Sequence, residues 1–103
     1  MLKLLLIFVF LIGCEQSTQK VVVYTALDKR FSEPILKKFE QETGIKVLAK
    51  YDTESNKSVG LTACLIEEKN HPKCDVFWNN EIVNTIRLKN LGILAKYKSK
   101  NAN

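Results

Sequence analysis

Residues 21–50 read VVVYTALDKRFSEPILKKFEQETGIKVLAK, and this stretch decides the fold class. Residues 21–23 are a β-branched run, typical of a strand that is buried on both faces of a parallel sheet. Apolar residues then recur at helical spacing until Gly44, after which residues 45–50 again read as a strand. The order strand, helix, strand predicts a parallel βαβ unit with its helix on one face of the sheet.

The limits of this first helix are marked by residues with known local preferences. Ser32 is a candidate N-cap, and Pro34 would fall in the first turn, where its missing N–H costs little. Gly44 would end the helix in a left-handed conformation, and Ile45 would fold back on the helix in a Schellman motif. The apolar face expected to contact the sheet consists of Phe31, Ile35, Leu36 and Phe39.

Two further helices and one strand are predicted in the rest of the chain. A polar loop at residues 51–58 leads to a second helix, which Pro72 separates from a short apolar strand at residues 75–78. Asn79 or Asn80 would cap a third helix. The predicted fold class is therefore α/β, with the order β-α-β-α-β-α in a doubly wound parallel sheet.

Apolar spacing also predicts which faces of these two helices are buried. A Schellman motif is expected at the end of the third helix, with Gly92 as its glycine and Ile93 in contact with Leu88. The second helix would bury Val59, Leu61, Thr62, Leu65 and Ile66. The third would bury Ile82, Val83 and Ile86.

The first residues, MLKLLLIFVFLIGC, read as an export signal. Lys3 precedes an apolar run at residues 4–12 that is shorter than the ~20 residues a membrane-spanning helix needs. The ending LIGC is similar to the bacterial lipobox, in which cleavage before the cysteine exposes it for lipid attachment. We expect residues 1–13 to be a lipoprotein signal peptide, Cys14 to carry the lipid and residues 14–20 to be a tether. The protein would then be exported to the periplasmic or cell-surface face and anchored to a membrane; an ordinary signal peptide or a buried strand is the alternative.

Composition excludes several functional classes. The net charge of +5 comes from 16 basic and 11 acidic residues that are interleaved, so no nucleic-acid partner is expected. This mild basicity is typical of a solvated protein surface. The alternative is that the basic residues attract lipid headgroups or an anionic ligand. The chain contains no GxSxG, GxxxxGK[ST], GxGxxG or HExxH motif, and only 4 glycines. We therefore expect a protein that is not an enzyme, although an enzyme with an α/β lobe stays open.

Topology predicts where a ligand would bind. In doubly wound sheets, ligands bind at the carboxyl ends of the strands. Here those ends are residues 24–26, 51–58 and 78–80. Helices begin close to these ends, and helix N-termini favour anions.

Four carboxylates fall near the same strand ends and helix starts. Oxygen ligands of this kind bind hard cations, but carboxylates at such positions are equally typical of helix caps and first turns. The sequence leaves both interpretations open for Asp28, Asp52, Glu54 and Glu81.

Cys64 and Cys74 flank the turn between the second helix and the third strand. In an exported protein they could form a disulfide. Alternatively, Cys64 is a small apolar core residue and Cys74 begins the strand. A zinc site is not expected, because these residues and the single histidine lack the usual close pairs.

Five segments together resemble a known family: VVVYT, FEQETGIKV, YDTESNKSVGL, CDVFWNNE and LKNLGILAKY. Their order and spacing are similar to those of the extracellular solute-binding proteins of ABC importers. The ferric-iron-binding branch is the most similar, with a helix ending in ETGIKV and a strand like ADVFW. The resemblance covers residues 1–103 and implies a two-lobed periplasmic-binding-protein fold of type II. Residues 21–103 would be an incomplete N-terminal lobe of the solute-binding domain.

The resemblance also implies a function and contact residues. Ferric iron would be cargo, with no cofactor, and the partners would be the permease and ATPase of the importer. The histidine ligand of some members falls near Asp28, a weak metal candidate, and the glutamate ligand near Val59; the two ligating tyrosines come from a later part of the fold. The ligand contacts implied by position are Thr25, Ala26, Asn56, Lys57, Ser58 and Asn79.

Two alternatives to ferric iron uptake remain at this point. Relatives in the same family bind phosphonates, thiamine or other small anions, and Lys57 and Ser58 at a helix start would suit such a ligand. A small stand-alone lipoprotein of structural or interaction type is the alternative from another class.

Overall fold

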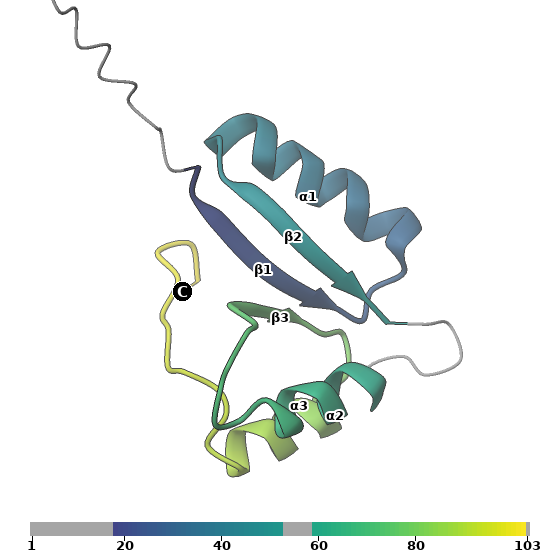
Figure 1. Cartoon of the computed structure of the whole chain (residues 1–103), viewed down its shortest axis with the longest axis vertical. Helices are drawn as coiled ribbons and strands as arrows, with labels where there is room; N and C mark the ends of the chain where they lie inside the picture. Colours follow the sequence, from purple (N-terminus) through teal and green to yellow (C-terminus); the bar gives the residue numbers. More distant parts are fainter. Residues whose placement is uncertain (1–17, 53–58, 103) are drawn as a thin grey trace, which may run out of the picture.

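The computed structural model describes residues 18–52 and 59–102, so the predicted signal peptide, Cys14 and the candidate contacts Asn56, Lys57 and Ser58 lie outside it. The predicted order of elements is confirmed. They are β1 (Lys20–Thr25), α1 (Lys29–Thr43), β2 (Lys46–Tyr51), α2 (Val59–Glu67), β3 (Val76–Trp78) and α3 (Ile82–Asn90) (Figure 1). In the described part of the chain, every helix is too short or too polar to cross a bilayer.

The three strands form one parallel sheet in the order β2-β1-β3. In its register, Lys20 lies opposite Lys46, and Thr25 lies between Tyr51 on one side and Trp78 on the other. The β-branched run of β1 thus occupies the centre of the sheet, as its composition predicted. Burial along β1 increases toward its carboxyl end.

Side chains of β1 alternate between two covered faces of the sheet. Val23 lies on the face of α1, where it lines an apolar hollow together with Leu36. Tyr24 points to the other face and forms the core with residues of α2 and α3, which are Leu61, Leu65 and Leu88. Figure 1 shows α1 lying along the strands and α2 beside α3. Helices on both faces make the sheet doubly wound.

The start of α1 differs from the prediction, because Asp28 and not Ser32 is the N-cap. The Asp28 carboxylate accepts the N–H of Arg30 at 3.0 Å. Ser32 is fully buried in the first turn, where its hydroxyl donates to the carbonyl oxygens of Leu27 and Asp28. Two good capping residues lie four positions apart, and the earlier one begins the helix. Pro34 consequently lies inside the helix.

The end of α1 is left-handed at Gly44, as predicted, but it is not a Schellman motif. Gly44 has a φ of 71°, and its N–H donates to the carbonyl oxygen of Glu40 at 2.9 Å. The N–H of Ile45, which a Schellman motif would direct to the same carbonyl, donates instead to the Thr43 hydroxyl at 3.1 Å. A polar residue at the helix end thus selects the simpler left-handed motif.

The end of α3 confirms the predicted Schellman motif. Gly92 has a φ of 73°. Its N–H donates to the carbonyl oxygen of Lys89 at 3.0 Å, and the N–H of Ile93 donates to that of Leu88 at 3.1 Å. Ile93 also packs against the core that contains Leu88.

Gly44→Ala should destabilise the protein by about 1–2 kcal/mol, because an L side chain is strained in this left-handed region. A Cβ at this position would meet nothing within 4 Å, so backbone strain is the whole cost. Gly44→Asn should cost less, since Asn tolerates the conformation better. Urea denaturation of the three proteins checks this order, and an alanine variant as stable as the wild type would contradict it.

Much of the apolar surface predicted to be buried is exposed. On α1, Leu36 is buried, but Phe31 and Ile35 are 55% and 54% exposed. The predicted face of α3 is wrong: Leu88 is the buried residue, on roughly the opposite side of the helix. The residues of that predicted face are exposed, namely Ile82, Val83 and Ile86.

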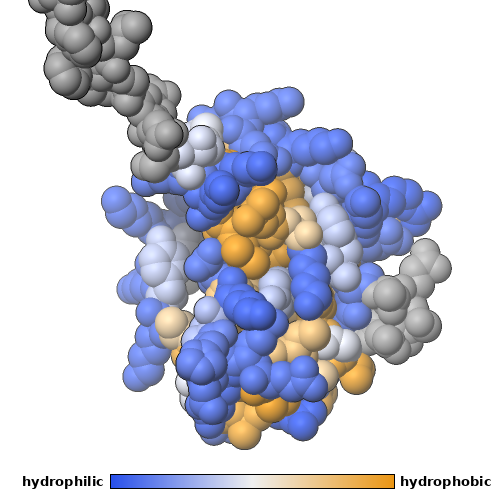
Figure 2. Space-filling view, in the orientation of Figure 1, coloured by the Kyte–Doolittle hydropathy of each residue, from blue (hydrophilic) through white to orange (hydrophobic). Residues whose placement is uncertain are grey.

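Apolar side chains also gather over the strands. Figure 2 shows a hydrophobic patch in the middle of the molecule, surrounded by hydrophilic side chains, and a second one toward α2 and α3. Val59 of α2, predicted to be buried, is 66% exposed. Exposed apolar areas of this kind mark surfaces that contact further protein or another partner.

Candidate ligand crevice at the carboxyl edge of the sheet

The carboxyl ends of the three strands meet at one edge of the sheet. The N–H of Ala26 donates to the carbonyl oxygen of Trp78 at 3.0 Å, and the N–H of Asp52 donates to that of Thr25 at 3.2 Å. The structure therefore brings Thr25, Ala26 and Asn79, three of the residues implied as ligand contacts, to this edge. Asp28 follows Thr25 closely in sequence, immediately before α1 begins at Lys29.

Thr25 and Ala26 form the buried floor of this edge. Thr25 is fully buried, and its hydroxyl oxygen accepts the N–H of Leu27 at 3.1 Å. This hydrogen bond turns the chain from β1 toward α1. The side chain of Thr25 thus shapes the turn that positions Asp28.

Asp28 is exposed at the start of α1. One carboxylate oxygen accepts the N–H of Arg30, and the other lies 3.9 Å from the Arg30 guanidinium. The carboxylate is therefore a helix cap in the structure, as one of the two sequence interpretations expected. Its exposed position leaves it accessible to a cation.

Asn79 holds the turn between β3 and α3. Its amide nitrogen donates to the carbonyl oxygen of Glu81 at 2.6 Å and to the Thr85 hydroxyl at 3.0 Å, while its amide oxygen accepts the N–H of Glu81 at 3.2 Å. The cap of α3 is Glu81, not Asn79 or Asn80 as predicted. Asn79 instead holds the backbone of the cap residue, Glu81, in place.

A carboxylate lies at the start of each described helix. Asp28 caps α1, and Glu81 caps α3, where its carboxylate accepts the N–H of Asn84 at 3.1 and 3.2 Å. Asp52 accepts the N–H of Leu61, near the start of α2, at 3.2 Å. The three helix N-termini, which would otherwise favour an anion, thus already interact with negative charge. Among the described residues, no three metal-binding side chains are close enough to form a metal site, and Glu54 lies outside them.

Glu81→Gln should destabilise the protein at neutral pH and have little effect in acid. Desolvation disfavours the charged form of Glu81, but hydrogen bonds from the backbone N–H groups of Asn84 and Val83 outweigh it and lower the pKa from its usual 4.5. A carboxyl group with a lowered pKa stabilises the folded state above the unfolded-state pKa. That stabilisation is lost as the pH falls through the folded-state pKa.

Urea denaturation at a series of pH values checks this expectation. The stability gap between wild type and Glu81→Gln should be constant above about pH 5 and close as the pH falls below about 4. Glu67→Gln makes the same charge change at the exposed end of α2 and should show no comparable gap. A gap for Glu81→Gln that widens in acid would contradict the capping role.

A second polar cluster lies on the face of the sheet covered by α2. The Tyr24 hydroxyl donates to both carboxylate oxygens of Glu68 at 3.0 Å. Burial of the phenol, this hydrogen bond and the negative charge of Glu68 raise the pKa of Tyr24 to about 12. The ammonium group of Lys50 lies 5.1 Å from the centre of the Tyr24 ring.

Both cysteines of the predicted disulfide are partly buried free thiols in the structure. The Cys64 sulfur lies 3.6 Å from the Lys50 ammonium. The Cys74 thiol donates to the carbonyl oxygen of Val76 at 3.1 Å, and burial raises its pKa. Pairing of the two cysteines stays a prediction.

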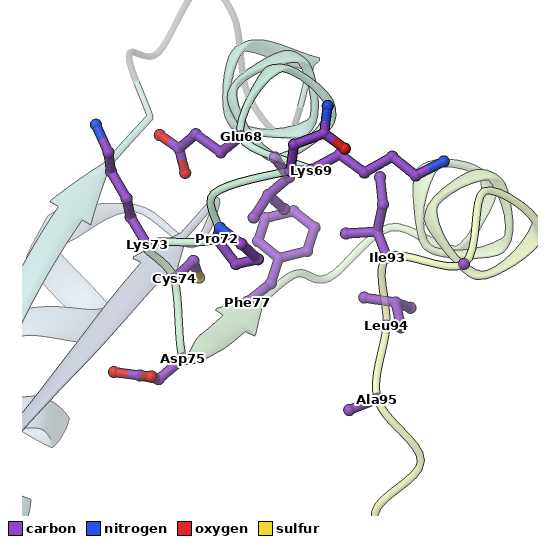
Figure 3. Close-up of a pocket in the computed structure, with 13 residues that line it drawn as sticks. Glu68, Lys69, Pro72, Lys73, Cys74, Asp75, Phe77, Ile93, Leu94 and Ala95 are labelled. Atoms are coloured by element: carbon purple, nitrogen blue, oxygen red, sulfur yellow. The ribbon is translucent and has the colours of Figure 1, made fainter.

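The sequence did not predict a cavity of about 430 Å³ at the amino end of β3 (Figure 3). Asp75 fixes the loop beside it, because its carboxylate accepts the N–H of Val22 at 2.8 Å and its own N–H donates to the Val22 carbonyl oxygen. Segments distant in sequence form the walls, so no local pattern could indicate the cavity. Among the residues around it are Lys69, Pro72, Lys73, Phe77, Ile93 and Leu94.

The fold is similar to that of two iron-binding proteins of known structure. Iron-bound HitA from Pseudomonas aeruginosa aligns with 78% of this chain at a TM-score of 0.68 and 26% sequence identity. Ferric iron-binding protein A of Mannheimia haemolytica, in an open conformation, aligns with 81% at a TM-score of 0.67 and 29% identity. The chain spans 25% of the length of each. It matches no protein-family model, and no curated protein is significantly similar to it in sequence.

Proposed function

We propose that this chain is part of the ferric-iron-binding component of an ABC importer. In this proposal, residues 21–103 form part of the first lobe of a two-lobed periplasmic-binding-protein fold of type II. Similarity to two iron-binding proteins over about four-fifths of the chain carries the proposal. The α/β sheet and its helices are consistent with a fragment of such a fold.

The carboxylates at the carboxyl edge favour a cation over a small anion, although Lys29 and Arg30 at the start of α1 add positive charge there. Carboxylates interact with the N-termini of α1, α2 and α3, so an anion approaching these helices would meet negative charge. A hard cation such as ferric iron is instead attracted by carboxylate oxygens. A phosphonate or another small anion would need hydrogen-bond donors from other parts of the protein, which makes it the weaker candidate within this family.

The mechanism in this proposal is binding and release. Thr25 and Ala26 are buried at the carboxyl edge, and the exposed carboxylate of Asp28 is the candidate iron ligand in this lobe. Closure of the second lobe would complete the coordination, and contact with the permease and its ATPase would open it again. No covalent bond of the substrate is broken, so the proposed protein is not an enzyme.

Export and anchoring belong to the same proposal. A lipid on Cys14 would hold the protein at the outer side of a membrane, and the residues between Cys14 and β1, which begins at Lys20, would be the tether. Metabolic labelling with a fatty acid tests the anchor. Label should enter the wild-type protein and be absent from Cys14→Ser.

The exposed apolar faces argue against the stand-alone lipoprotein. Phe31 and Ile35 on α1, and Ile82 and Val83 on α3, are each more than half exposed. In the proposed lobe, further structure covers these faces. Residues 14–103 alone should therefore bind a hydrophobic dye strongly and melt over a broad range of temperature. A sharp thermal transition without dye binding would support the stand-alone function instead.

A binding titration tests the iron proposal. It uses the whole protein that the gene encodes, read through the codon for Asn103 for as long as the frame stays open. Ferric ion delivered as its citrate complex should bind with saturation in equilibrium dialysis. Asp28→Asn should weaken binding about tenfold, as expected for loss of a group at a metal site. Glu42→Gln, which changes a charge near the far end of α1, is the matched control.

Competition identifies the ligand class. Saturable binding of thiamine or of a phosphonate, with no binding of ferric ion, would overturn the iron proposal and retain the family. Absence of binding to all three, in a protein that melts cooperatively, would overturn the solute-binding proposal as well.

A further inference from the structure

Three elements bring a lysine and a cysteine into contact. Lys50 on β2 places its amine nitrogen 3.6 Å from the sulfur of Cys64 on α2. The same nitrogen lies 5.1 Å from the centre of the ring of Tyr24 on β1. The two reactive side chains are therefore direct neighbours across the interface between the sheet and α2.

The environment holds this pair together. The aromatic face of Tyr24 attracts the Lys50 ammonium, and the Tyr24 hydroxyl is itself fixed by Glu68. Within the described part of the chain, no carboxylate forms an ion pair that would draw Lys50 away. Lys50 is exposed and Cys64 is only partly buried, so a small oxidant can reach both atoms.

We propose that oxidation joins Lys50 and Cys64 through one oxygen atom, in an Nζ–O–Sγ cross-link. With hydrogen peroxide as oxidant, one molecule converts the thiol to a sulfenic acid and releases water. The Lys50 ammonium releases a proton to water, and its amine nitrogen then gives an electron pair to a second peroxide while the sulfenic oxygen bonds to that nitrogen. Two more waters leave. Sulfur and nitrogen each give up two electrons, the amine keeps one hydrogen, and a dithiol reductant reverses the reaction.

The cross-link would join β2 to α2 covalently. It closes residues 50–64 into a covalent ring. A covalent link between two elements stabilises a fold mainly by restricting its unfolded state. Oxidation would thus tie α2 to the sheet. This inference stands on the contact itself and does not depend on the proposed ligand.

Peptide mapping tests the cross-link in the full chain. The protein is treated with hydrogen peroxide, its remaining thiols are blocked, and it is digested with trypsin. We expect residues 47–57 joined to residues 58–69, with the summed mass plus one oxygen and minus two hydrogens. Trypsin should fail to cleave after Lys50, and dithiothreitol should restore the separate peptides.

Variants distinguish this cross-link from a disulfide and from oxidation of Cys64 alone. Lys50→Gln and Cys64→Ser should each abolish the joined peptide, whereas Cys74→Ser and Lys46→Gln should retain it. The melting temperature should rise on oxidation of the wild type and not of Lys50→Gln. A joined peptide that has lost only two hydrogens and contains Cys74 would show a disulfide and overturn the proposal. A Cys64 peptide that gains oxygen without joining Lys50 would also overturn it.

Discussion

Replacing Leu88 with alanine should destabilise the protein by about 2–5 kcal/mol, the range for removing a buried leucine side chain. Leu88 is completely buried and packs with Tyr24, Leu61 and Leu65, so it joins α3 both to α2 and to the sheet. Native proteins have a total stability of about 5–15 kcal/mol, so in the whole protein that the gene encodes this loss is a large fraction of the total. The variant should consequently show a large unfolded fraction in urea at concentrations that leave the wild type folded.

Leu91→Ala is the matched control for this substitution. It removes the same atoms from the next turn of the chain, where Leu91 is 39% exposed at the end of α3. It should cost less than about 1 kcal/mol. Circular dichroism during urea denaturation measures both losses. Equal losses for the two variants would mean that α3 does not pack through Leu88.

The importance of Leu88 was not visible in the sequence, although the existence of α3 was. The spacing of Ile82, Val83 and Ile86 correctly predicts a helix, because periodicity reports the period of the pattern. It does not report which structure an apolar stripe contacts. Here α3 rests on α2 through Leu88, and the stripe faces outward. The exposed stripe of Ile82, Val83 and Ile86 is therefore an apolar surface that no described element covers.

Local hydrogen bonds explain the other differences at helix ends. Sequence reasoning predicted Gly44 and Gly92 at left-handed positions, because few other residues tolerate them. It could not rank Asp28 over Ser32 as a cap, since both side chains can accept a backbone N–H. That choice depends on the length of the turn after β1, which the Thr25 hydroxyl sets through its bond to Leu27.

The candidate site was predicted at the level of topology. Parallel strands require their carboxyl ends to meet, so the edge containing Thr25, Ala26 and Asn79 follows from the order of elements. The role of each side chain did not follow from it. The structure shows the Asn79 amide bonded to Glu81 and Thr85, and its contact with a ligand stays a prediction. A polar residue at a strand end can bind a ligand or hold its own backbone, and the sequence does not distinguish these roles.

Tyr24→Phe should make the protein less stable at neutral pH and remove part of its sensitivity to alkali. The variant loses the hydroxyl that donates to Glu68, a hydrogen bond to a charged group that we expect to contribute about 1–2 kcal/mol. The wild-type phenol has a pKa raised to about 12 in the folded state, from 10.0, through burial and the adjacent Glu68 carboxylate. The positive charge of Lys50 faces the ring but does not offset these effects.

The sign of the pH dependence follows from the direction of this shift. A group whose pKa is raised by folding contributes stability that is fully present below the unfolded-state pKa. The wild type should therefore lose roughly 1–2 kcal/mol between about pH 10 and pH 12, allowing for solvent screening of the phenolic oxygen. Tyr24→Phe lacks this titrating group. The difference in stability between the wild type and Tyr24→Phe should therefore shrink over the same pH range.

Urea denaturation at alkaline pH measures the difference, and Tyr97→Phe is the control because Tyr97 is 86% exposed. The stability of Tyr97→Phe should change with pH in the same way as that of the wild type. The ultraviolet absorbance of phenolate gives a second readout, since one tyrosine should ionise only near pH 12 or on unfolding. A Tyr24→Phe protein whose disadvantage is constant up to pH 12 would show that Glu68 does not oppose ionisation of the phenol. The polar contact between β1 and the end of α2 would then depend on packing alone.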